Sequence, residues 1–164
     1  MEEMIRPILR CRALLAEKTP LNSDCGAFCG AACCKSLEGE ETGMLLFPGE
    51  ETLYRGKPAF RLTETGQGTL LFCPGACDRT DRPLACRLFP LLPLVREAGI
   101  RVAVDARARA VCPLRRPDAC SETFVEAVRQ AGEILSGQPE QRRFLVQLTR
   151  EHDDLRTMQK RMGV

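Results

Sequence analysis

Cysteine is the residue type that could do chemistry in this chain. The sequence holds 10 Cys among 164 residues, and most of them are clustered. In a reducing compartment, clustered thiols are more often metal ligands or redox centres than disulfides. We therefore predict eight metal ligands in two clusters: Cys25, Cys29, Cys33 and Cys34, followed by Cys73, Cys77, Cys86 and Cys112.

The spacing of the first cluster limits how it can bind an ion. A regular helix over residues 25–34 rises about 1.5 Å per residue, which separates Cys25 from Cys33 by about 12 Å. Thiolates that share one zinc lie only about 2.3 Å from the ion. Either this segment coils as a loop around one ion, or its thiols belong to two centres. The glycines that follow Cys25 and Cys29 favour a loop.

Eight thiolates match two tetrahedral sites with four ligands each. Cys11 and Cys120 are then left over, although Cys120 follows Cys112 closely enough to replace one of the eight. Soft thiolates exclude magnesium and calcium and suit zinc, iron or an iron–sulfur cluster. We expect zinc as the cofactor, with iron or an iron–sulfur cluster as the alternative.

Arginine is concentrated around the second cluster. Nine Arg and three acidic residues lie between Arg79 and Arg116. A four-thiolate zinc site carries a formal charge of 2−, which nearby guanidinium groups would stabilise; a solvated basic surface is the other interpretation. The formal net charge is only +2, and this region offers Phe89 as its one aromatic residue. We therefore expect no nucleic-acid partner.

Several other classes of function lack support in the sequence. The one histidine, His152, falls on the apolar face of a predicted helix and is expected to be structural. The sequence has no dinucleotide-binding or P-loop glycine pattern, and no convincing Ser-His-Asp or paired-carboxylate arrangement. It leaves open whether the chain is an enzyme, and it identifies no protein partner.

Composition and patterning bear on location. Charged residues make up 28% and hydrophobic residues 44% of the chain, which is typical of a soluble globular protein. No apolar run approaches the roughly 18–20 residues of a membrane helix, and the N-terminal stretch contains acids where a secretory signal is apolar. We expect a cytoplasmic protein without membrane contact, which argues against a disulfide framework.

Periodicity predicts the elements that must position the thiols. We expect first a helix over 4–18 with Cys11 on its core face, then a hairpin over 60–63 and 69–72 and an irregular loop over 73–86. A second hairpin over 91–95 and 100–104 follows, then a helix over 121–137 and a last helix that begins at Pro139. Phe144, Leu148, Leu155, Met158 and Met162 continue the spacing of the last helix. The acidic stretch Glu38–Glu41 is expected to be a solvated loop.

These elements predict the α+β class, with small antiparallel hairpins and N- and C-terminal helices around cysteine-rich metal-binding loops. We expect a single domain over 1–164, with the motif region at 25–112 and the C-terminal helices at 121–162. The C-terminal helices are expected to pack across the small sheet.

The two clusters also resemble a known family. The stretch DCGAFCGAACC, followed by CDRTDRPLACRLFP, is similar to the YkgJ-like cysteine-cluster family, with its motif C-x2-C-x2-CC followed by RPxxCRxFP. The resemblance covers residues 25–90. Arg82-Pro83, Cys86-Arg87 and Phe89-Pro90 stand in the family's order, whereas the first half is longer here, C-x3-C-x3-CC.

The resemblance implies chelation of zinc or iron, with no common reaction. One branch of similar proteins methylates flagellin lysines. The leading hypothesis is thus a metal-binding protein, and the alternative is an iron–sulfur redox or protein-modifying enzyme. Metal storage or delivery is a third hypothesis, for which incomplete coordination would be expected.

Overall fold

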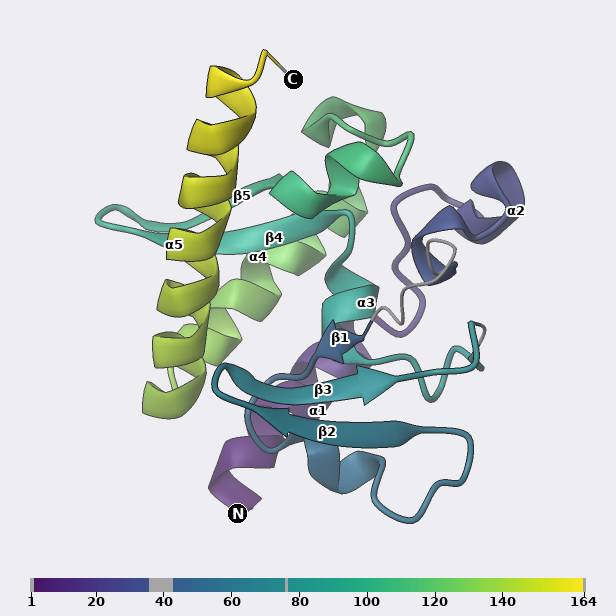
Figure 1. Ribbon diagram of the computed structural model, residues 1–164. Helices are drawn as coiled ribbons and strands as arrows, with labels where there is room; N and C mark the ends of the chain where they lie inside the picture. Colours follow the sequence, from purple (N-terminus) through teal and green to yellow (C-terminus); the bar gives the residue numbers. More distant parts are fainter. Residues whose placement is uncertain (1, 36–42, 76, 164) are drawn as a thin grey trace.

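The chain forms helices and two small antiparallel sheets, which confirms the α+β prediction (Figure 1). The computed structural model describes residues 2–35, 43–75 and 77–163. Its helices are α1 (Glu2–Leu14), α2 (Cys25–Cys29), α3 (Leu84–Leu88), α4 (Glu122–Ser136) and α5 (Pro139–Arg161). Its strands are β1 (Met44–Leu45), β2 (Arg61–Thr65), β3 (Gly68–Phe72), β4 (Leu91–Arg96) and β5 (Gly99–Val104). The solvated loop expected at Glu38–Glu41 lies outside the described residues.

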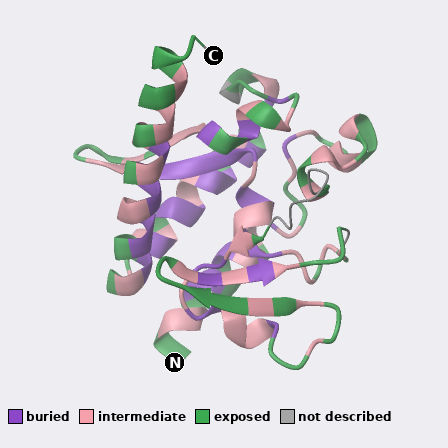
Figure 2. Cartoon of the chain, in the orientation of Figure 1, coloured by how far each residue is buried: buried purple, intermediate pink, exposed green. Residues whose placement is uncertain are grey.

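The main core forms where α4 and α5 cover the β4–β5 hairpin (Figure 2). The two strands pair antiparallel from Leu91 opposite Val104 to Arg96 opposite Gly99. Gly132 allows α4 to approach closely, because a Cβ at this position would lie 2.6 Å from the Cβ of Pro93. Both the second predicted hairpin and the packing of the C-terminal helices across it are confirmed.

Local signals set the ends of the C-terminal helices. Ser121 caps α4, since its Oγ accepts the N–H of Phe124 at 3.3 Å, and Pro139 stands in the first turn of α5. The predicted apolar face of α5 is only partly correct, because Met158 and Met162 are 54% and 65% exposed. The last turns of α5 extend past the core that they would have to cover.

Helix α1 packs against α4 and contributes the buried side chains of Ile8 and Cys11 to the main core. The Cys11 thiol donates to the carbonyl of Ala131 at 3.5 Å, which confirms its prediction as a core residue. The helix ends at Leu14, earlier than the predicted residue 18. No helix within the described ranges is long and apolar enough to span a membrane.

The smaller sheet has the strand order β1-β3-β2. Strands β2 and β3 form the first predicted hairpin, with Arg61 opposite Phe72. Strand β1 adds to the other edge of β3 and was not predicted, because two residues carry no periodicity. A separate small core under this sheet contains Leu46, Tyr54 and Leu71. Strand β3 ends immediately before Cys73.

Candidate functional site

The first cysteine cluster is split by a reversal of the chain. Cys25 to Cys29 form the short helix α2, capped by Asp24, whose Oδ1 accepts the N–H of Gly26 at 3.1 Å. The helix ends at Gly30, whose φ of +63° is a left-handed conformation that glycine adopts without strain. A 3-10 turn at Ala32–Cys34 follows. The expected loop is therefore a helical turn, a reversal and a second turn.

The second cluster spans a loop and a helix. The expected irregular stretch over 73–86 ends at Pro83, and Cys86 lies within α3. The loop after β3 returns to the first cluster, because a Cβ on Gly75 would lie 3.6 Å from the carbonyl oxygen of Cys34. Thiols that are far apart in sequence thus become neighbours here.

One set of neighbouring thiols gathers around α3, and we term it the first thiol group. It consists of Cys34, Cys73, Cys77 and Cys86. Burial raises the pKa of Cys86, and the charges of the other three members raise it further. Burial also raises the pKa of Cys77, whereas Arg82 lowers it. The thiols lie close enough for each to influence the ionisation of its neighbours.

Cys33 lies beside this group and differs from its neighbour Cys34 in exposure. Cys33 is exposed and Cys34 is half-buried. A hydrogen bond from the Cys33 thiol to Cys34 lowers the pKa of Cys34, and Arg82 lowers it as well. The same hydrogen bond is the main reason why the pKa of Cys33 is raised. Cys34 is therefore the member of the pair that carries a thiolate more readily.

Another set, the second thiol group, consists of Cys25, Cys29 and Cys112. Burial raises the pKa of Cys112, and the charge of Cys29 adds to this effect. Burial also raises the pKa of Cys25, followed by the charge of Cys29 and, to a smaller extent, that of Cys112. Cys25 and Cys112 also pack against the same core, although sequence order grouped Cys112 with Cys73, Cys77 and Cys86. Cys120, which was not among the predicted ligands, also interacts with Cys112 and Cys25.

Arg82 provides positive charge to both thiol groups. It hydrogen-bonds with Cys77 and interacts electrostatically with Cys34 and Cys25. Other arginines of the same basic stretch have different roles: Arg96 binds Asp153 with both of its terminal nitrogens at 2.7 Å, and Arg107 binds Asp105. Among these arginines, Arg82 is therefore the main candidate for stabilising thiolates.

A buried ion pair holds the segment that precedes Cys86. The Glu50 side chain is 0% exposed, and its Oε1 accepts from Arg12 at 2.9 Å and from the N–H of Leu84 at 2.8 Å. Arg12 also donates to the Tyr54 hydroxyl at 2.9 Å and to the Thr80 carbonyl at 2.7 Å. This network ties α1 and the 3-10 turn Glu50–Leu53 to the start of α3.

Arg87 braces the same segment from inside α3. Its guanidinium donates to the carbonyl of Arg82 at 2.9 Å and to that of Thr80 at 3.2 Å. The Tyr54 hydroxyl donates to the carbonyl of Asp81 at 2.8 Å. Sequence reasoning missed Arg12, Glu50 and Tyr54 as positioning residues, because each lies at least 23 residues from Cys77 and only the tertiary fold joins them.

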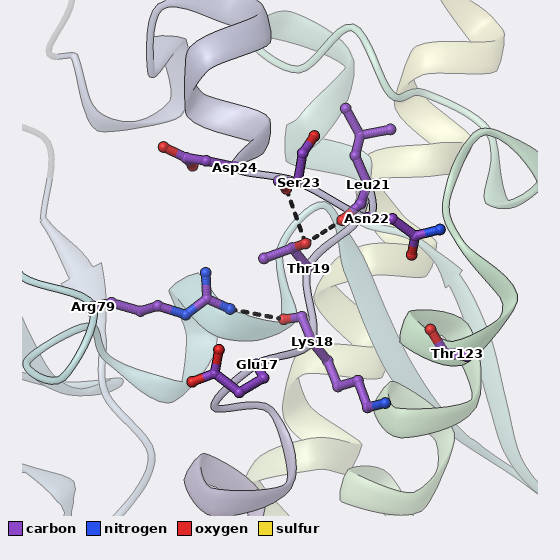
Figure 3. A pocket seen from close by; sticks show the side chains of 9 residues that line it. All are labelled: Glu17, Lys18, Thr19, Leu21, Asn22, Ser23, Asp24, Arg79 and Thr123. Carbon is purple, nitrogen blue, oxygen red and sulfur yellow. Dashed lines mark hydrogen bonds between the residues drawn. The ribbon is translucent and has the colours of Figure 1, made fainter.

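A polar pocket of about 360 Å³ lies beside the segment that leads into α2 (Figure 3). Two of its side chains bond to the backbone: Thr19 donates to the carbonyl of Ser23 at 3.0 Å, and Arg79 donates to that of Ala16 at 2.6 Å. No cysteine lines it; its walls are Glu17, Lys18, Thr19, Leu21, Asn22, Ser23, Asp24, Arg79 and Thr123. These bonds stiffen the approach to Cys25.

The donor chemistry of the thiol groups fits a soft metal ion, because thiolates are preferred ligands of zinc and iron. Within residues 2–35, 43–75 and 77–163, no set of three or more Cys, His, Asp or Glu side chains is already arranged to hold a metal ion. Binding would therefore require the thiols to converge. Helix α2 has no fully buried residue, and Cys25 packs partly buried against the main core.

Comparisons with known proteins identify no relative of this chain. No protein-family model matches the chain, and neither a curated protein nor a solved structure is similar to it.

Proposed function

We propose that this protein binds zinc through the thiolates of the first thiol group. The observation that carries the proposal is the return of the loop after β3 to the turn of Cys34, where a Cβ on Gly75 would lie 3.6 Å from the carbonyl oxygen of Cys34. The charges of Cys34, Cys73 and Cys77 also act on Cys86 in α3. Soft sulfur ligands select zinc or iron over the hard cations. The resemblance to the YkgJ-like family points to the same chemistry.

Arg82 supports this function by its charge. Four thiolates around zinc leave a formal charge of 2−, and a guanidinium that is hydrogen-bonded to Cys77 offsets part of it. Deprotonation of the half-buried Cys86 opposes binding, because burial raises its pKa. Zinc supplies the compensating attraction, since a coordinating thiol loses its proton.

The ion would act as a structural cross-link. It would join the turn that carries Cys34, which has no buried residue, to the loop after β3 and to helix α3, whose leucines are part of the main core. Metal-binding free energy at such a site is folding free energy.

The test is elemental analysis, with an absorption spectrum, of protein purified anaerobically from cells supplied with both zinc and iron. We expect bound zinc without visible colour. Cys77→Ser is expected to lose zinc from the first group, whereas the control Cys11→Ala removes a core thiol and should retain it. Chelation of the wild-type protein should lower its Tm.

Two results would contradict the zinc proposal. Protein that is folded and metal-free as isolated, with a Tm unchanged by added zinc, would remove the metal function. Iron with acid-labile sulfide and a visible absorption band would instead support the alternative, an iron–sulfur redox or protein-modifying enzyme that uses the same thiols.

A further inference from the structure

The two outer edges of the β4–β5 hairpin differ in how they are protected. Strand β4 contains Pro93, which has no N–H to donate. The N–H of Val95, two residues on, donates to Thr149 Oγ1 of α5 at 3.0 Å. Proline residues and covering helices both keep an edge strand from pairing with another chain. The outer edge of β4 is therefore closed by residues of this chain.

The register of the hairpin determines which backbone groups of β5 point away from β4. Because the N–H of Val95 is donated to α5, Val95 and its partner Ile100 form a pair without hydrogen bonds between the strands. Alternation along the ladder places Val102, opposite Pro93, in the same class of pair. The N–H and C=O groups of Ile100 and Val102 thus point to the outer edge of β5. Within the described part of the chain, no residue forms a hydrogen bond with them there.

The side chains of β5 differ between its two faces. Ile100 and Val102 are half-buried on the side of α4, where a Cβ on Gly132 would lie 2.7 Å from Cγ2 of Ile100. Arg101 is on the opposite face, is exposed, and makes no ion pair with any residue that the structure describes. The 3-10 turn Pro117–Ala119 contacts β5 without a hydrogen bond to it, and the turn of the hairpin projects past α5 (Figure 1). The open edge is thus apolar on one side and positively charged on the other.

We infer that β5 is a docking site for an extended segment of another protein, which adds to the hairpin as a third strand. Unpaired backbone groups of an edge strand bind such a segment, and its alternate side chains give the specificity. Opposite charges on neighbouring strands attract, so the segment that fits carries an acidic residue on the side of Arg101. Its other face is apolar, because it meets Ile100 and Val102. The inference does not depend on metal binding.

A second copy of this chain fits the edge less well than an acidic segment does. Antiparallel pairing of two β5 strands would bring both Arg101 side chains to the same face of the joined sheet. Like charges on paired strands are destabilising, and a charged residue on an edge strand is a common means of preventing such pairing. The charge of the edge therefore favours a different protein as the occupant.

The experiment uses the full chain, isotope-labelled for NMR, and two synthetic peptides, one of alternating Val and Glu and one of alternating Val and Lys. Titration gives the affinity of each peptide, and hydrogen exchange reports on the amides of Ile100 and Val102. We expect the Glu peptide to bind and to slow the exchange of both amides, because their N–H groups gain acceptors. The Lys peptide should bind several-fold more weakly, because its charge meets that of Arg101.

Two variants of β5 test the backbone and the charge separately. Val102→Pro removes an outward N–H and no hydrogen bond to β4, so it should weaken binding of the Glu peptide about tenfold. Arg101→Glu should reverse the preference, so that the Lys peptide binds more tightly than the Glu peptide. The control Arg55→Glu makes the same change of charge at an exposed residue outside the hairpin and should alter neither affinity. Far-UV circular dichroism checks that each variant is folded.

Several outcomes would overturn this inference. One is the absence of binding by either peptide, and another is binding that leaves the amides of Ile100 and Val102 unprotected or that Arg101→Glu does not alter. A free protein that sediments as a dimer with both amides already protected would show that a second copy occupies the edge instead. If Val102→Pro does not fold, the reversal expected for Arg101→Glu still decides. All of these results are independent of zinc content, so they leave the proposed function to its own test.

Discussion

The positive charge of Arg82 acts on cysteines of both thiol groups. It interacts with Cys25 and Cys34 from the first sequence cluster and with Cys77 from the second. A fixed positive charge favours the thiolate form of each neighbour. Arg115 acts more locally, because among these thiols it lowers the pKa of Cys112. The two arginines thus offer a comparison between a shared and a local counter-charge.

Replacing Arg82 tests this role in metal-free, reduced protein. Arg82→Gln is expected to shift alkylation of Cys34 and Cys77 to higher pH, with a several-fold slower reaction at neutral pH, because the positive charge that lowers both pKa values is lost. The measurement is iodoacetamide labelling against pH, resolved by peptide mass spectrometry. Arg115→Gln is the control and should affect Cys112 alone. Unchanged rates at Cys34 and Cys77 in Arg82→Gln would rule out the shared counter-charge.

At the scale of elements, the position of α3 depends on contacts from outside its own sequence. The helix is only five residues long, and isolated helices of this length are unstable in water. Glu50 accepts its first N–H, that of Leu84, and Arg87 bonds back to the carbonyls that precede it. Glu50 Oε2 is buried without a hydrogen-bond partner among the described residues. This cost is tolerated because the other carboxylate oxygen anchors both Arg12 and α3.

Removing Glu50 is therefore expected to be costly. Glu50→Ala leaves the largely buried Arg12 without its charge partner and should lower the free energy of unfolding by about 3–5 kcal/mol. Urea denaturation monitored by circular dichroism measures the change. The control is Asp153→Asn in the exposed pair with Arg96, which should cost less than about 1 kcal/mol. If both variants lose a similar free energy of unfolding, the buried pair of Glu50 stabilises the fold no more than an exposed ion pair does.

At the scale of the whole molecule, α5 joins the hairpin to the helices that surround it. Its buried His152 accepts the N–H of Ala106 on Nδ1 at 3.2 Å, and Gln159 donates to the carbonyl of the same residue at 2.9 Å. The structural role expected for the one histidine of the chain fits this position. Burial lowers the pKa of His152, with Asp105 and Asp153 opposing the shift and Arg156 and Arg96 adding to it.

This pKa predicts how stability depends on pH. An unfolded chain protonates its histidine below about pH 6.5, whereas the folded protein keeps His152 neutral to lower pH. The contribution of His152 is thus complete above about pH 6.5 and is lost as the pH falls below it. His152→Asn keeps an acceptor near the Nδ1 position without titrating. We expect its free energy of unfolding to decline less than that of the wild type between pH 7 and 5.5, as measured by urea denaturation. Parallel declines would contradict this origin.

The sequence by itself determined the elements whose signals are local. Two short segments around turn glycines predicted the first hairpin, and alternation predicted the second. Ser121 and Pro139 marked the starts of α4 and α5, and the spacing of Ile8 and Cys11 placed α1 in the core. These signals persist because caps, turns and apolar periodicity act within a few residues. Where the signal was weak, as for the two-residue β1 or the five-residue α3, the prediction missed the element.

Only the tertiary structure decided which thiols are neighbours. Sequence order assigned Cys112 to the group of Cys73 and Cys86, whereas in the fold Cys112 and Cys25 pack against the same core, which includes Cys120. The same is true of Arg82 and Glu50, whose partners come from distant segments. Proximity of this kind depends on how α1, α4 and the two sheets pack, and that packing is set by the shared core and not by the spacing of the cysteines along the chain.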